Sequence, residues 1–247
     1  MSDAIDARIA DRLSRIHERI AGAARRAGRS PDDVRLVAVS KRQPVERIAA
    51  AVRAGVRDLG ENRVQEARDK RAAVLAAIGD AARPRWHLVG SLQRNKAALA
   101  TELFDSIETV DRESLAASLA RHAREASRRV PVLLQVNISR EPQKGGVAPE
   151  RAAELLAACR EHDSLAWVGL MGIPAANRDP EASRAAFAQL RALRDTLQGQ
   201  PGGDSLRALS MGMSGDFEVA IEEGATSIRV GTALFGERDA SQEGRTR

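Results

Sequence analysis

The chain has 247 residues, a hydrophobic content of 43% and a formal net charge of +5. This length and apolar content suffice for one large folded domain. A single cysteine excludes internal disulfides and cysteine-based metal clusters within the chain, and an aromatic content of 2% leaves few side chains on which nucleic-acid bases could stack.

The charge distribution is typical of solvated helix faces. Arginines alternate with acidic residues in segments such as 67–74 and 111–129, so the positive charge is not gathered into one basic stretch. No run approaches the roughly 20 apolar residues of a membrane-spanning helix, and residues 1–13 lack the pattern of a secretory signal. The four histidines lack metal-ligand spacing. We therefore expect a cytoplasmic protein that binds no nucleic acid, membrane or metal.

Short β-branched apolar runs alternate with longer amphipathic segments along the chain. The predicted helices span 3–27, 44–55, 61–79, 92–103, 111–129, 149–162, 179–197 and 214–224. The predicted strands span 34–40, 57–61, 85–90, 104–110, 130–137, 167–172, 206–212 and 227–235. Eight strands alternating with helices favour an α/β fold of the (β/α)₈ TIM barrel type, although a doubly wound open sheet shares much of this pattern.

The two ends of the chain differ in amphipathic character. Residues 3–27 form an amphipathic pattern before the first strand, whereas the residues after the last strand are too polar to pack as a final helix. We expect the N-terminal helix to cover the flank that this missing helix leaves open. The sequence thus predicts a single barrel domain over 1–238 and a disordered tail at 239–247.

The functional residues of a parallel barrel are expected at the carboxyl ends of its strands. Lys41 follows the first predicted strand, and Asn62 follows the second. Arg229 lies between Ile228 and Val230 inside an apolar strand, where its guanidinium needs acceptors to offset the cost of burial. A nearby carboxylate or the lone pair of a ligand nitrogen would satisfy it.

Glycines and hydroxyl residues gather after the last two strands. Ser210, Ser214 and Gly215 belong to the first cluster, and Gly231 and Thr232 to the second. Glycine lets an anion approach the backbone N–H groups closely, and hydroxyls add donors. Because loops after strands seven and eight commonly hold phosphate in this fold, the segments suggest a phosphate cradle, although serine and glycine are also ordinary turn residues.

Lys41 is one of only four lysines among 39 cationic residues. Because arginine cannot form an imine, a chain that otherwise favours arginine is expected to keep lysine where a nucleophilic amine is required. A lysine opposite a phosphate cradle suggests a Schiff base with pyridoxal 5′-phosphate (PLP), with Arg229 facing the pyridine nitrogen. A phosphosugar aldolase-type lysine and a plain surface charge are the alternatives that the residues leave open.

The sequence also resembles a known family. The stretches VAVSKRQP, LGENRVQEA, WHLVGSLQRNK, GLMGIP and LSMGMSGDFEVAIEEGATSIRVGTALFG are similar, in order and spacing, to the pyridoxal phosphate homeostasis proteins, also called the YggS-like family. The resemblance implies a barrel of the alanine racemase N-terminal type, with the cofactor held on Lys41 as an internal aldimine. It also implies cofactor contacts from Asn62, Ser210, Arg229, Gly231 and Thr232.

The resemblance further implies what the protein does. Such a protein carries or buffers PLP through a reversible Schiff base without catalysis, supports intracellular PLP homeostasis, acts as a monomer and hands the cofactor to PLP-dependent apoenzymes. A racemase of this fold takes its second base, a tyrosine, from a second domain. The chain contains no tyrosine, and we expect no such second domain. A PLP-dependent enzyme such as a weak amino-acid racemase is the alternative.

Three positions matter for how closely the site follows the family. Arg63 stands where the family often has tyrosine, and Gly215 replaces a residue that is commonly acidic or polar. Lys144 lies in a loop that often carries lysine in the family, and it is either a second, transient amine for the cofactor or a solvated loop charge.

Overall fold

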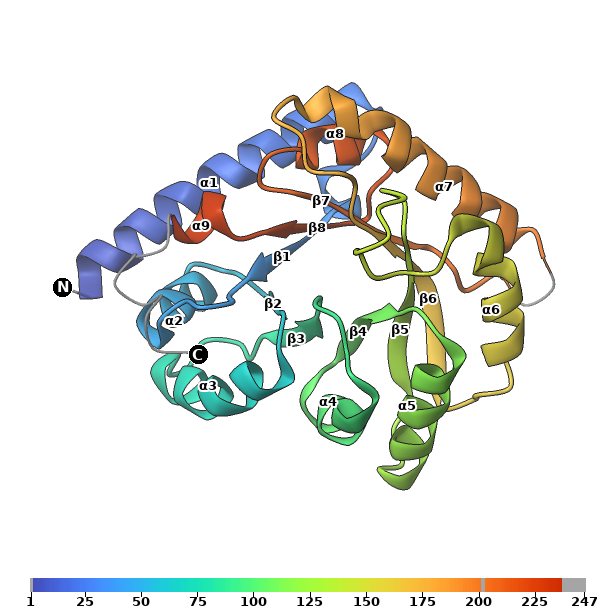
Figure 1. The fold of residues 1–247 in the computed structure, drawn as a ribbon. Coiled ribbons are helices and arrows are strands. Elements are labelled where there is room, and N and C mark those ends of the chain that lie inside the picture. Colours follow the sequence, from blue (N-terminus) through green and yellow to red (C-terminus); the bar gives the residue numbers. More distant parts are fainter. Residues whose placement is uncertain (1, 201–202, 237–247) are drawn as a thin grey trace.

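The computed structural model describes residues 2–200 and 203–236, and in it the strands close into a parallel barrel (Figure 1). Each strand pairs with the next in chain order, and the last pairs with the first, for example at Leu36 and Ile228. The predicted barrel is confirmed and the doubly wound alternative is wrong. The strands are β1 (Arg35–Val39), β2 (Asp58–Glu61), β3 (Arg85–Leu88), β4 (Ser106–Val110), β5 (Val130–Val136), β6 (Leu165–Gly172), β7 (Ala208–Met213) and β8 (Ser227–Val230).

Helices surround the barrel as an outer ring (Figure 1). They bury apolar faces against the outward-pointing strand residues, which gives the continuous core expected of this architecture. Short 3₁₀ turns precede β1 and the helices α4, α6 and α7. The helices are α1 (Ser2–Arg26), α2 (Val45–Arg53), α3 (Val64–Ala77), α4 (Ala97–Leu103), α5 (Glu113–Glu125), α6 (Ala152–Cys159), α7 (Arg184–Gln198), α8 (Phe217–Glu222) and α9 (Thr232–Phe235).

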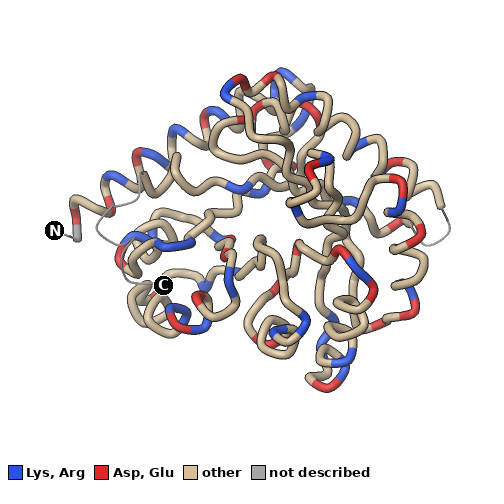
Figure 2. Tube along the Cα trace, in the orientation of Figure 1, with Lys and Arg blue, Asp and Glu red and all other residues tan. Residues whose placement is uncertain are grey.

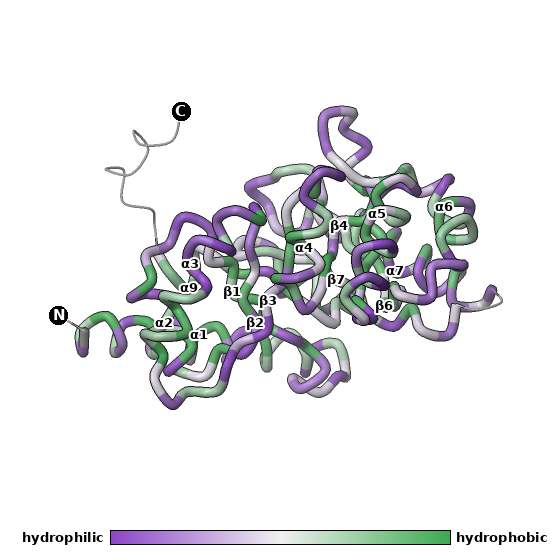
Figure 3. The backbone as a smooth tube through the Cα atoms, turned by 90° about the horizontal axis from the view of Figure 1, so that it is seen from below, coloured by the Kyte–Doolittle hydropathy of each residue, from purple (hydrophilic) through white to green (hydrophobic). Residues whose placement is uncertain are grey.

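The N-terminal helix α1 closes the ring. Ile9, Leu13, Ile16 and Ile20 recur every three or four residues on one face, and each is at least 96% buried. Hydrophobic and hydrophilic bands therefore alternate along the helix (Figure 3). It packs against α2, α8 and α9, which is the flank that the sequence predicted it to cover.

One predicted strand is too long. The segment predicted at 227–235 is extended only as far as Val230, and Thr232–Phe235 forms the helical turn α9. The chain turns at Gly231, and α9 then buries Leu234 and Phe235. A short apolar run can form either a strand or a buried helix, so tertiary packing decided this segment. The predicted tail at 239–247 lies outside the described residues.

Charged residues of both signs alternate along the helices, as seen on α1 (Figure 2). Pairs such as Arg15 with Asp11 and Arg184 with Glu181 lie on exposed faces, where ion pairs contribute little to stability. Cys159 is fully buried in α6. Within the part of the chain that the structure describes, no helix is both long and apolar enough to cross a membrane.

Candidate functional site

A pocket of about 390 Å³ opens at the carboxyl ends of the strands. It brings together five of the six predicted site residues, which are Lys41, Asn62, Arg229, Gly231 and Thr232. The rest of its wall comes from the ends of β1 and β7, from the segments that follow β1, β3, β6 and β7, and from Gly236, and it includes Ser214, Gly215 and Ile173. Segments far apart in the chain thus meet at one end of the barrel.

Lys41 is held in place through the residues on either side of it. On one side, the Ser40 hydroxyl donates to Glu61 Oε1 at 2.6 Å, and both residues are fully buried. On the other, the Arg42 backbone N–H donates to the Glu66 carboxylate. Arg42 has a φ of 56°, in the left-handed region that non-glycine residues rarely adopt. The turn that presents Lys41 is therefore fixed by two carboxylates.

Lys70 joins these two carboxylates. Its Nζ lies 2.7 Å from Glu61 Oε1 and 2.9 Å from Glu66 Oε1, and it donates to the Ser40 carbonyl at 2.8 Å. Burial raises the pKa of Glu61, although the charge and hydrogen bonds of Lys70 and Ser40 oppose the rise. Lys70 is thus a buried structural cation that supports the strand end carrying Lys41.

The wall formed after β7 and β8 suits an anion. Ser214 Oγ accepts a hydrogen bond from the Ala233 backbone N–H at 3.3 Å, so its hydroxyl hydrogen can still be donated to a ligand. A side chain at Gly231 would come within 3.3 Å of a backbone oxygen of β1, whereas one at Gly215 would meet no neighbour within 4 Å. Together with Thr232, these residues offer hydroxyl and backbone donors to an anion.

Arg229 is buried in the strand, as predicted, and is only 4% exposed. Its Nη1 donates to Ser210 Oγ at 2.7 Å and its Nη2 donates to the Gly172 carbonyl at 3.0 Å. Burial lowers the pKa of Arg229, against the opposing charges of Glu108 and Asp216. Arg229 thus contributes a fixed guanidinium to the pocket wall.

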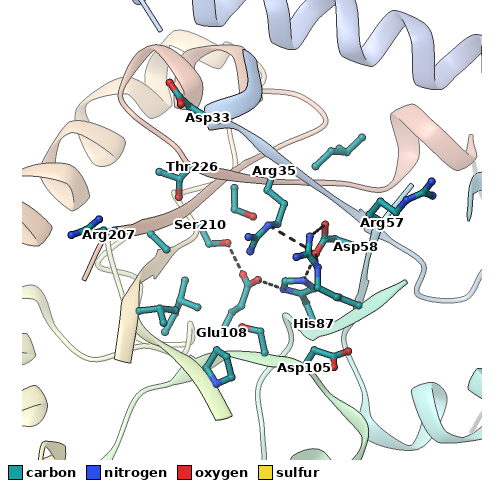
Figure 4. A pocket seen from close by; sticks show the side chains of 18 of the residues that line it. Asp33, Arg35, Arg57, Asp58, His87, Asp105, Glu108, Arg207, Ser210 and Thr226 are labelled. Atoms are coloured by element: carbon teal, nitrogen blue, oxygen red, sulfur yellow. Dashed lines mark hydrogen bonds and ion pairs between the residues drawn. The ribbon is translucent and has the colours of Figure 1, made fainter. Parts of the chain in front are cut away.

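Ser210, the sixth predicted residue, does not line this pocket. It is fully buried in the barrel interior, where its Oγ donates to Glu108 Oε2 at 2.5 Å (Figure 4). The same oxygen accepts the hydrogen bond from Arg229. Ser210 therefore lies one layer below the pocket, beneath the guanidinium rather than beside Gly231 and Thr232.

A chain of buried polar side chains continues from Ser210 toward the other end of the barrel (Figure 4). His87 Nδ1 lies 3.0 Å from Glu108 Oε1, and His87 Nε2 lies 2.8 Å from Asp58 Oδ1. Arg85 then donates to both oxygens of Asp58 at 2.8 Å. These residues face a larger pocket of about 880 Å³ at the amino ends of the strands.

The side chains of this buried hydrogen-bonded series alternate in charge. Burial by itself lowers the pKa of His87, but its hydrogen bonds to Asp58 and Glu108 outweigh this effect and raise the pKa to about 9. Burial likewise favours the neutral form of Glu108, yet the hydrogen bond and charge of His87 and the charge of Arg229 hold its pKa below the usual range. At neutral pH the interior thus holds a protonated His87 between two carboxylates.

The sequence analysis missed His87, Glu108 and Lys70. His87 stands between two apolar neighbours in a short strand, the pattern that singled out Arg229, and Glu108 follows an apolar residue in another buried strand. Period-two alternation turns such residues into the barrel. Lys70 shares the rarity that singled out Lys41. Lys144 does not line the pocket, because its Nζ is held by Glu141 and by the carbonyl of Pro174.

Comparison with known proteins places this barrel in a class. The sequence model of the family "alanine racemase, N-terminal domain" matches residues 12–239. The chain also superposes on an alanine racemase from Clostridium difficile with a TM-score of 0.72, covering 94% of this chain and 57% of that one. At 14% identity, that superposition shows the fold alone.

Two further matches are much more similar in sequence. The pyridoxal phosphate homeostasis protein of Vibrio cholerae is 42% identical over 235 residues, which cover 95% of this chain and 98% of that one. The structure of PipY from Synechococcus elongatus, solved with PLP bound, is 40% identical with a TM-score of 0.80, covering 92% of this chain and 100% of that one. The chain belongs to the pyridoxal phosphate homeostasis protein family.

Proposed function

We propose that this protein binds PLP reversibly through a Schiff base on Lys41 and carries or buffers the cofactor in the cytoplasm without catalysing a reaction. The observation that supports this proposal best is that one pocket joins the Lys41 amine, an anion-binding wall and a fixed guanidinium. These groups match the aldehyde, the phosphate and the ring nitrogen of PLP. The PLP-bound structure of PipY supports the same ligand.

Each residue has a role in this proposal. Lys41 Nζ attacks the aldehyde carbon, and the carbonyl oxygen leaves as water, so that water reverses the reaction. Ser214, Gly231 and Thr232 hold the phosphate oxygens. Arg229 donates a hydrogen bond to the unprotonated pyridine nitrogen.

Asn62 contacts the ring from the end of β2 in this proposal. The remaining wall is partly apolar, with Val39, Val89 and Ile173 available to pack against the ring faces. The Lys41 turn is fixed by the cluster of Glu61, Glu66 and Lys70, so little ordering is required on binding.

The absence of catalysis follows from the same residues. A guanidinium facing the pyridine nitrogen disfavours its protonation, which weakens the ring as an electron sink. The 247 residues contain no tyrosine to act as the second base of a racemase. PLP-dependent apoenzymes are the proposed recipients, and the monomer is the proposed state.

The Lys41→Ala variant tests the covalent attachment. Wild-type protein is mixed with PLP, reduced with borohydride and digested, and the modified peptide is located by mass spectrometry. We expect the reduced pyridoxyl group on Lys41 in the wild type and in the matched control Lys144→Ala, and no adduct in Lys41→Ala. An adduct that persists in Lys41→Ala would show that another amine holds the cofactor.

Exchange of the α-hydrogen of amino acids separates a carrier from a racemase. PLP-loaded protein is incubated with L-alanine in deuterated water, and the α-proton signal is followed by NMR. The carrier proposal expects exchange no faster than with free PLP at equal concentration. Exchange that is faster than this and is lost in Lys41→Ala would establish the enzymatic alternative.

A further inference from the structure

The buried polar chain below the cofactor pocket is not explained by cofactor binding alone. Arg229, Ser210 and Glu108 come from β8, β7 and β4, and all three are at least 96% buried. A buried hydroxyl between a guanidinium and a carboxylate satisfies both charges at once. This arrangement gives Arg229 a counter-ion that lies on the side away from the pocket.

We propose that Glu108 is a positioning residue for the cofactor, acting through Ser210 on the guanidinium of Arg229. This inference rests on the proposed function, because it assumes that Arg229 faces the pyridine ring. The hydroxyl of Ser210 donates to Glu108 and accepts from Arg229, so a hydrogen bond to each of them connects the carboxylate to the guanidinium. In this proposal Ser210 acts through its hydroxyl from outside the pocket lining.

The geometry limits where Arg229 can go. Its Nη1 and Nη2 are tied to Ser210 and to the Gly172 carbonyl, which come from β7 and β6. Arg229 also feels the charge of Asp216, but that carboxylate already accepts from the Met213 backbone N–H and from Ser183. The hydroxyl-mediated contact therefore makes Glu108 the counter-ion that fixes the guanidinium.

Glu108 is itself held in place by His87, on the side away from Ser210. Its Oε1 lies 3.0 Å from His87 Nδ1, which leaves Oε2 directed at Ser210. Asp58 contacts the opposite nitrogen of His87 and makes no hydrogen bond to Ser210 or Arg229 within the described residues. A carboxylate of matched chemistry thus stands in the same hydrogen-bonded series, two residues further from the cofactor, and serves as the control.

The experiment compares Glu108→Gln, Ser210→Ala and Asp58→Asn with the wild type, using added PLP as the probe. Absorbance gives the dissociation constant and the pH midpoint at which the Lys41 imine loses its proton. Glu108→Gln removes the stronger of the two carboxylate charges that act on the guanidinium and leaves only that of Asp216, so we expect the midpoint to fall by about one pH unit and PLP binding to weaken about tenfold. Ser210→Ala keeps both charges, so we expect about tenfold weaker binding with a midpoint close to the wild type.

The outcomes separate this inference from the proposed function. Asp58→Asn should bind PLP within about twofold of the wild type. Equal effects of Asp58→Asn and Glu108→Gln on PLP binding would mean that the buried polar side chains only stabilise the fold, and this would overturn the proposal. If Glu108→Gln does not fold, unchanged binding in Ser210→Ala overturns it. Failure of the wild type to form an adduct on Lys41 would instead refute the proposed function.

Discussion

Replacing Lys70 with methionine tests the cluster that fixes the Lys41 turn. The ammonium of Lys70 lies 2.7 Å from Glu61 and 2.9 Å from Glu66, and its side chain is 10% exposed. Lys70→Met leaves the fully buried Glu61 carboxylate without a cation, and its Oε2 has no hydrogen-bond partner in the described structure even now. Breaking a buried ion pair on one side costs about 3–5 kcal/mol, and we expect a loss of about 3 kcal/mol because Glu66 is partly exposed.

Urea unfolding of Lys70→Met, Glu61→Gln and the double variant measures this loss. Burial raises the pKa of Glu61, so removing its charge should change the free energy of unfolding by less than about 1 kcal/mol. The double variant should recover about half of the loss, since no fully buried carboxylate is then left without a cation. A cost below about 1 kcal/mol for Lys70→Met, or no recovery in the double variant, would refute the reasoning.

Two more predictions concern stability and pH. The pKa of His87 is raised from 6.5 to about 9, so its interactions stabilise the fold below pH 6.5, and about 3 kcal/mol is lost as the pH rises through 9. His87→Gln should flatten this dependence in urea unfolding, and an unchanged slope would contradict the assignment. In Gly90→Ala, the new Cβ would lie 2.2 Å from the Asn62 carbonyl oxygen, so PLP should bind more weakly and the fold should lose stability. The control Gly22→Ala, in α1, should gain up to about 1 kcal/mol, and equal behaviour of the two variants would argue against the clash.

The strand order and the carboxyl-end site could be predicted because they follow from local patterns. Lys41 and Asn62 follow the first two strands, and parallel strands that alternate with helices bring such positions to one end of the barrel. The family resemblance added the identity of the ligand. The prediction that these residues contact PLP stays a prediction until a complex is examined.

The interior of the barrel could not be predicted in the same way. Ser210 lies in a segment that suggested a phosphate cradle, yet strand alternation turns it inward, toward Glu108. Residues 108 and 210 are distant in the sequence, so only the closed barrel brings them together. The predicted extent of the last strand was wrong for a related reason, because the packing of Phe235 decides between strand and helix at α9.

A crystal structure of this protein soaked with PLP tests the central claim most directly. The account predicts continuous electron density from Lys41 Nζ to the cofactor, with the phosphate against Ser214, Gly231 and Thr232 and the ring nitrogen beside Arg229. Density that joins PLP to another lysine, or a phosphate bound at the amino-end pocket, would contradict it.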